Sequence, residues 1–185
     1  VAGALGQAPH PLVRAVLLED PPWYLGEQDE WDKGLYKTIF PMIRSQQVEM
    51  QTAGASLTDW VQAVATAPSP KGGTAADHVQ ARHILCSASA RMRHDPRAWD
   101  TSIDQTLLAS HRPDTPIQVP VTVIQADVQL GPAFMPGHND RFLAANPNAD
   151  IMLYEGATHL IHAGIEHADR FLGDLDAFVS THAQD

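Results

Sequence analysis

The residue whose type and position are best suited to catalysis is a histidine that follows a predicted strand. His159 ends the segment YEGATH, in which an apolar strand gives way to a Gly-Ala turn, and the apolar pair Leu160-Ile161 follows it. A general base needs such a placement, because its ring must be fixed by the backbone and must stay partly exposed. His159 is therefore a candidate catalytic base, and the alternative interpretation is an ordinary loop histidine.

A base of this kind needs a carboxylate that holds its tautomer and stabilises its charged form. Asp127 ends the run VTVIQAD and is a candidate for this acid. It would lie at the carboxyl edge of a parallel sheet, where such sheets place their sites.

The remaining histidines and the single cysteine give no pattern for a metal site. His159 and His162 form H-x-x-H, and His78 and His83 share a predicted helix, but neither pair has a third ligand at a typical spacing. Cys86 is the only cysteine, so the chain has no internal disulfide, and we expect it to be a small buried side chain in a helix. We predict no metal and no cofactor.

Short apolar or β-branched runs predict the strands that would position these residues. These runs are Ala15–Leu18, Val121–Ile124 and Ile151–Tyr154. Helical patterns alternate with them, at Val1–Leu5, around Phe142-Leu143 and at Ile165–Val179. Strand–helix alternation predicts an α/β fold, with a parallel sheet covered by helices on its faces.

Between the first and second of these strands lies a long region without a convincing strand. One apolar stripe predicts a single helix, through Trp31, Leu35, Ile39 and Ile43. Ser56 with Asp59 resembles a capping box at the start of another helix, and further helices are predicted at residues 75–92 and 103–108. The region is interpreted as an inserted all-helical domain.

Several segments resemble the α/β-hydrolase family. "VPVTVIQAD", "NPNADIMLYEGATHLIH" and "RFLGDLDAFV" are similar to the C-terminal third of that family, and "VAGALGQAPHPLVRAVLLEDPP" is similar to the helix and strand that follow its nucleophile elbow, G-x-S-x-G. The resemblance implies a hydrolase core in residues 1–24 and 114–185, containing the C-terminal three strands of the sheet. It implies a helical cap in residues 25–113.

The resemblance also implies roles for individual residues. His159 matches the catalytic histidine, which follows the last strand of the family's sheet. The family's common G-x-x-D pattern would place the acid at Gln129, which cannot carry the charge, so Asp127 remains one candidate. Asp20, with Glu19 beside it at the end of the first strand, is the other, because certain dehalogenases and lactonases take the acid from that earlier strand. We prefer Asp127 to Asp20 as the acid, and each of them could instead be a turn or helix-cap carboxylate. Trp23 and Tyr24 would either line the substrate pocket or fasten the cap to the core.

The expected activity is hydrolysis of a small ester, lactone or related acyl bond by a Ser-His-Asp mechanism. No G-x-S-x-G occurs in the chain, so we expect the nucleophile just upstream of Val1. The chain alone would be inactive, and an N-terminal half, possibly a second chain, would be its partner beside the small-molecule substrate. The alternatives are a dehalogenase or epoxide hydrolase with an Asp nucleophile, a cofactor-free haloperoxidase-like relative, and a non-catalytic small-molecule binder.

Charge and hydropathy argue against other classes of partner. The formal net charge is -10 and no basic stripe is present, so we expect no nucleic-acid partner. No apolar run reaches the roughly 20 residues that a membrane span needs. The segment Val1–Leu5 lacks the features of a signal peptide. Because we expect a further segment upstream of Val1, where any export signal would sit, a cytoplasmic location is the default expectation.

Overall fold

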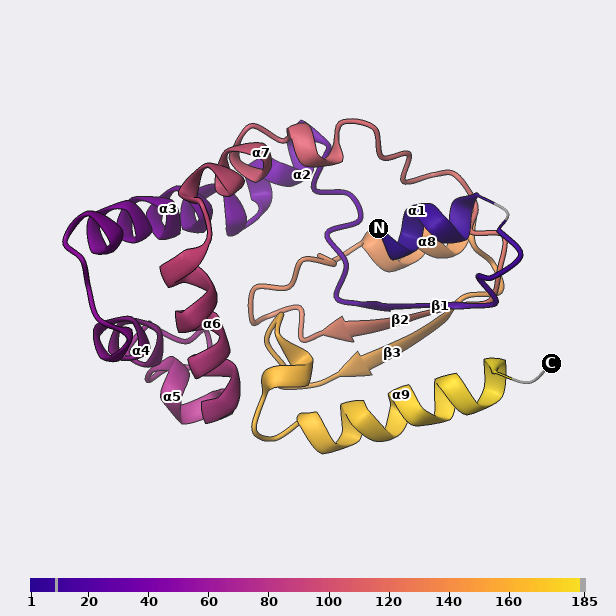
Figure 1. The fold of residues 1–185 in the computed structure, drawn as a ribbon. Coiled ribbons are helices and arrows are strands. Elements are labelled where there is room, and N and C mark those ends of the chain that lie inside the picture. The colour runs from indigo at the N-terminus through magenta and orange to yellow at the C-terminus, as the bar shows by residue number, and fades with distance from the viewer. Residues whose placement is uncertain (9, 184–185) are drawn as a thin grey trace. The chain divides into compact units, whose positions relative to one another are not determined.

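The chain forms two compact units, which we describe separately. The structure is a computed structural model that describes residues 1–8 and 10–183 (Figure 1). The first unit contains residues 1–24 and 111–162 and the chain from Glu166 on, and the second contains Leu25–Ser110 and Ala163–Ile165. The second unit thus covers most of the predicted helical cap, residues 25–113, together with a three-residue segment near the C-terminus.

The first unit is built on a parallel sheet. Its strands are β1 (Val16–Glu19), β2 (Val121–Ala126) and β3 (Asp150–Tyr154), in the order β1-β2-β3. The mixed α/β prediction is confirmed, and each predicted strand is present with ends shifted by one or two residues. Glu19 is in register with Ile124, and Ala126 with Tyr154, so the carboxyl ends of all three strands meet at one edge.

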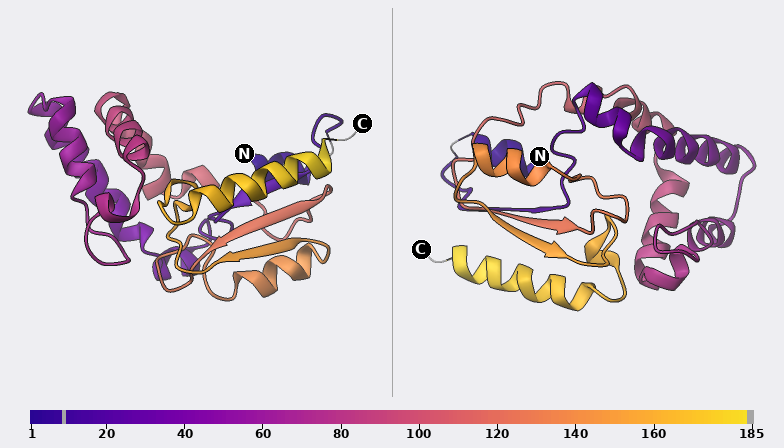
Figure 2. Two further views of the ribbon diagram at one scale, coloured as in Figure 1. Left: turned by 90° about the horizontal axis from the view of Figure 1, so that it is seen from below. Right: turned by 180° about the vertical axis from the view of Figure 1, so that it is seen from behind.

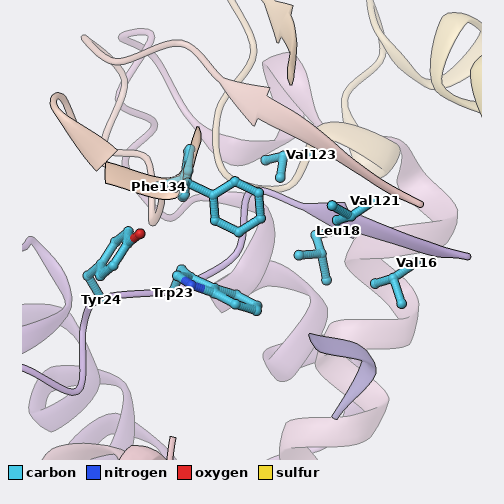
Figure 3. Close-up of a cluster of buried hydrophobic side chains, with 8 residues drawn as sticks. Val16, Leu18, Trp23, Tyr24, Val121, Val123 and Phe134 are labelled. Carbon is cyan, nitrogen blue, oxygen red and sulfur yellow. The ribbon is translucent and has the colours of Figure 1, made fainter. Parts of the chain in front are cut away.

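Helices cover both faces of this sheet. Helices α1 (Ala2–Gln7) and α8 (His138–Ala145) lie on one face, and α9 (Ala168–His182) lies on the other (Figures 1 and 2). Alternate residues of a strand point to opposite faces, so the central strand β2 contributes buried side chains to two separate apolar clusters. The first cluster is Val16, Leu18, Trp23, Tyr24, Val121, Val123, Phe134 and Phe142 (Figure 3). The second is Ile124, Ala126, Tyr154, Ala157, Ile161 and Phe171.

Helix α1 approaches the sheet closely because glycine lines its inner side. A Cβ atom on Gly3 would lie 2.3 Å from the Trp23 ring. A Cβ atom on Gly6 would lie 2.9 Å from methyl groups of Val16 and Ile117. Side chains at these two positions would push the helix off the first apolar cluster.

The second unit is helical. Its helices are α2 (Gln28–Lys33), α3 (Tyr36–Thr52), α4 (Leu57–Ala65), α5 (Ala75–His78), α6 (Ala81–Arg93) and α7 (Asp100–Ile103), with 3-10 turns η1 (Pro96–Trp99) and η2 (Thr106–Leu108). A third 3-10 turn, η3 (Ile161–Ala163), lies where the chain passes between the units. No helix within residues 1–8 and 10–183 is long and apolar enough to cross a membrane.

Three helices predicted as continuous are broken in the structure, and the shortest, over residues 103–108, is divided between the end of α7 and η2. The stripe through Trp31 and Leu35 is divided between α2 and α3, because Gly34 adopts an extended conformation and ends α2. Glycine is a weak helix former, so the break costs little there. The predicted helix over residues 75–92 is divided at Val79-Gln80, where the backbone pairs with residues 163–165 instead of continuing the helix.

Two smaller predictions about the second unit have opposite outcomes. The capping box at the start of α4 is confirmed: Asp59 N–H donates to Ser56 Oγ, and Ser56 N–H donates to the Asp59 carboxylate at 2.8 Å. The prediction that Cys86 is buried is wrong, since α6 presents it to solvent. Its side chain lies on the outer face of α6, away from buried Ile84 and Ala88.

Candidate active site

The candidate site residues lie at the carboxyl edge of the sheet. Asp20 directly follows β1, Asp127 directly follows β2, and His159 lies five residues beyond the end of β3. Parallel pairing brings these three strand ends together from distant parts of the sequence. All three residues belong to the first unit.

The structure pairs His159 with Asp20. The imidazole Nδ1 lies 2.8 Å from Oδ2 of Asp20, although the two residues are 139 positions apart. The Asp20 side chain has no exposed surface, whereas the His159 side chain is 37% exposed. An enclosed carboxylate that holds a partly open imidazole is the arrangement a general base requires.

Main-chain donors surround the Asp20 carboxylate. Ala133 N–H donates to Oδ2 at 2.7 Å, and Phe134 N–H donates to Oδ1 at 3.1 Å. Ala126 N–H approaches Oδ1 at 3.5 Å. These donors come from the end of β2 and the loop that follows it, and they compensate for the water that burial removes from the carboxylate.

The backbone of Asp20 has an uncommon conformation. Its φ is 33°, in the left-handed region, where aspartate is better tolerated than most residues. Its N–H still donates to Ile124 O at 2.7 Å, so the residue remains hydrogen-bonded to β2. Pro21-Pro22 follows, and the fixed φ of each proline leads the chain away from the sheet. This turn directs the Asp20 side chain inward, under the loop that carries Ala133 and Phe134.

Asp127, the acid preferred from sequence, binds backbone instead of the imidazole. Its Oδ2 accepts from Gly156 N–H at 2.8 Å, and its Oδ1 accepts from Gln129 N–H at 2.9 Å. Its own N–H donates to Ala157 O at 2.9 Å. The Gln129 N–H, and then the Gly156 N–H, hold the pKa of the Asp127 carboxyl below its usual value. The structure therefore brings Asp20, and not Asp127, to His159.

Gly156 is the point at which the chain turns toward His159. Its φ of 72° is one that glycine adopts freely and other residues avoid. Ala157 N–H donates to Tyr154 O at 3.1 Å, which closes a tight turn directly after β3. Sequence analysis identified this Gly-Ala turn, and the contact of Asp127 with Gly156 shows what holds it.

A second carboxylate–imidazole pair lies beside the first. Glu19 Oε1 is 2.8 Å from Nδ1 of His162 and accepts from His162 N–H at 2.9 Å, and Oε2 is 2.9 Å from the same ring nitrogen. Sequence analysis noted both residues without joining them. The available signal was the match between two adjacent acids, Glu19 and Asp20, and two histidines in H-x-x-H spacing.

The two residues proposed to contact substrate are core residues of the first unit. Trp23 is 5% exposed, and its Nε1–H donates to Pro113 O at 2.9 Å. Tyr24 has no exposed surface, and the Arg141 guanidinium carbon lies 4.3 Å from its ring centroid. Both rings pack in the first apolar cluster (Figure 3). A role for either in binding substrate stays a prediction.

The histidine pairs do not form a metal centre. His159 and His162 each face a separate carboxylate, Asp20 and Glu19. Within residues 1–8 and 10–183, no group of three or more His, Cys, Asp or Glu side chains is placed to hold a metal ion. The arrangement is suited to moving a proton between an imidazole and a reacting group.

Comparisons of the chain with family models, with curated proteins and with solved structures found no match. The likeness of its segments to α/β-hydrolases thus stays a resemblance. Function is inferred from the geometry of His159 and Asp20 and from the sheet edge on which they meet.

Proposed function

We propose that this chain carries the acid–base part of an α/β-hydrolase-type enzyme that cleaves a small ester, lactone or related acyl bond. The observation that carries the proposal is the 2.8 Å contact between His159 Nδ1 and the buried carboxylate of Asp20. With Nδ1–H bound to Asp20, the lone pair of Nε2 is the group that can accept a proton.

The chemistry proceeds in two halves. In the first, a serine Oγ attacks the acyl carbon, its proton passes to His159 Nε2, and the same proton then passes to the departing alkoxide. In the second, water attacks the acyl-enzyme and gives its proton to Nε2, which returns it to the serine oxygen. Asp20 holds the ring in one tautomer and stabilises its charged form during both halves.

The nucleophile in this proposal lies outside the chain. No serine of the 185 residues stands in a G-x-S-x-G sequence. The resemblance of residues 1–22 to the helix and strand after a nucleophile elbow suggests a segment that precedes Val1, in the same polypeptide or as a separate chain. Its strand would pair with β1 and present the serine at the edge where His159 lies.

The test is ester hydrolysis by the complete enzyme, with p-nitrophenyl acetate and a simple γ-lactone as substrates. His159→Gln and Asp20→Asn should each lower kcat by about 10³ to 10⁴, because the ring is lost or loses its orientation. Asp127→Asn is the matched control and should stay within about tenfold of the wild type, since it only weakens a turn.

Two outcomes would contradict this assignment. Near-normal turnover by His159→Gln would remove His159 from the mechanism. A loss in Asp127→Asn as large as in Asp20→Asn would return the acid role to Asp127. Because Asp20 is buried among main-chain donors, thermal unfolding of each variant must be measured beside its activity. His159→Gln is the safer test, since that side chain is 37% exposed.

One observation favours a second candidate, a dehalogenase or epoxide hydrolase with an aspartate nucleophile. The acid follows β1, the earlier strand, a placement found in certain dehalogenases as well as in lactonases. A fluorophosphonate probe separates the two, because it labels an activated serine and leaves an aspartate unmodified. Labelling of a serine supports the acyl hydrolase. Halide release from a haloalkane without any labelling supports the dehalogenase.

A further inference from the structure

The loop that carries His159 is held by three carboxylates. Two of them are at the end of β1, and the third directly follows β2. Asp127, after β2, binds the Gly156 amide at the start of the loop. Asp20, after β1, binds the His159 ring in its middle. Glu19, the last residue of β1, binds both the backbone and the ring of His162 at its end. Only the second of these contacts has a part in the chemistry described above.

The Glu19–His162 contact uses both carboxylate oxygens of Glu19 and two nitrogen atoms of His162. One carboxylate oxygen takes the His162 main-chain N–H at 2.9 Å, and both oxygens lie within 2.9 Å of the ring Nδ1. The side chains are 23% and 42% exposed, so water competes with the pair only in part. Ile161, the preceding residue, is fully buried in the second apolar cluster.

The chain beyond His162 explains why the loop needs an anchor at this point. Residues 163–165 belong to the second unit, where Ala163 O accepts from Gln80 N–H at 2.9 Å and Ile165 N–H donates to His78 O at 2.8 Å. Along the chain, the contact of His162 with Glu19 comes after His159 and directly before this segment, so it bonds the end of the His159 loop to β1.

We propose that Glu19 and His162 are positioning residues that fix the His159 loop to the end of β1. The inference rests on the proposed function, because it assigns them a role in keeping the base in place. Proton transfer requires hydrogen-bond distances, and a shift of about 1 Å in a reacting group can lower the rate by about 10². The paired placement of Glu19 and Asp20 lets one strand end hold both the ring of the base and the loop that bears it.

The first experiment measures the loop itself in the complete enzyme, without any substrate. Glu19→Ala should speed hydrogen exchange of the His162 amide by about tenfold or more, because that amide loses its acceptor. It should also broaden or shift the ring ¹H–¹⁵N signals of His159. Glu155→Ala is the matched control: it removes an exposed acid from the same loop, and both signals should stay as in the wild type.

The second experiment measures turnover in the complete enzyme. Glu19→Ala should lower kcat by roughly 10- to 100-fold with little change in KM, because the base is displaced while the substrate pocket is not. Glu19→Gln should recover much of this loss, since its amide oxygen can still accept from His162 N–H. Glu155→Ala should turn over as the wild type does.

The outcomes separate the two proposals. An unchanged hydrogen-exchange rate of the His162 amide in Glu19→Ala would overturn the positioning role. A loss of turnover in Glu19→Ala as large as that in Asp20→Asn would also overturn it, because Glu19 would then be the orienting acid. If the wild type hydrolyses no ester while Glu19→Ala still frees the His162 amide and disturbs the His159 ring, the proposed function fails and the positioning role stands.

Discussion

Asp20 and Asp127 are both strand-end aspartates, yet the structure uses their carboxylates in different ways. Asp20 is buried and meets the His159 ring together with the amides of Ala133 and Phe134. Asp127 is only partly buried and receives two main-chain N–H groups, from Gln129 and Gly156. Asp127 therefore holds the turn that leads to His159, and Asp20 holds the His159 ring.

The turn held by Asp127 should respond to acid. The pKa of the Asp127 carboxyl lies below its usual value of 3.8, because Gln129 N–H and Gly156 N–H donate to the charged form. For a lowered pKa, the stabilising contribution is complete above the unfolded value and is lost as the pH falls through the folded value. An NMR titration of the Gly156 amide shift should have its midpoint below 3.8, and Asp127→Asn should abolish that step. A midpoint at or above 3.8 would contradict the assignment.

At the residue scale, the sequence allowed His159 and two possible acids to be identified, but not the choice between the acids. His159 was recognisable because a strand, a tight turn and an apolar pair surround it within a few residues. The choice of Asp20 depends on the loop after β2, which brings Ala133 and Phe134 over β1. Such a long-range contact leaves no local pattern in a single sequence.

At the scale of elements, the close approach of α1 to the core gives a matched pair of glycine substitutions. Gly3→Ala should lower the free energy of unfolding by about 1–3 kcal/mol, because its Cβ would overlap the buried Trp23 ring. Gly173→Ala, in the exposed side of α9 with no atom within 4 Å of the new Cβ, should raise it by roughly 0.5–1 kcal/mol. Chemical denaturation of both variants measures the difference, and equal effects would show that α1 does not pack as described.

The elements of the first unit were predictable to within a few residues, and those of the second were less so. Apolar and β-branched runs mark the strands because a parallel sheet is buried on both faces. The helix over residues 75–92 was predicted as one element because its local pattern is continuous. Its break at Val79-Gln80 depends on pairing with residues 163–165, about 85 positions away, and no helix propensity encodes that pairing.

At the scale of the whole molecule, the outer edge of the sheet determines how the chain should behave alone. In the part of the chain that the structure describes, β1 pairs with β2 and has no second neighbour. An apolar strand with one unpaired edge tends to bind another strand. We expect the isolated 185-residue chain to self-associate and to show no His159-dependent ester hydrolysis. Sedimentation velocity over a range of concentrations, with an assay on the same sample, tests this. A monomer at every concentration would contradict it.

The two ends of the helical insertion meet in the first unit. Trp23, just before the insertion, packs its ring against His111, just after it, with ring centroids 4.6 Å apart, and its indole N–H binds Pro113 O. The helical segment between Trp23 and His111 therefore begins and ends at neighbouring points of the first unit. In protein engineering, it could be replaced by another helical segment without changing the strand order of the sheet. A replacement must also offer backbone partners to Ala163 and Ile165, which now bind Gln80 and His78. Grafts without such partners would leave the backbone groups of Ala163 and Ile165 without hydrogen bonds, close in the chain to His159.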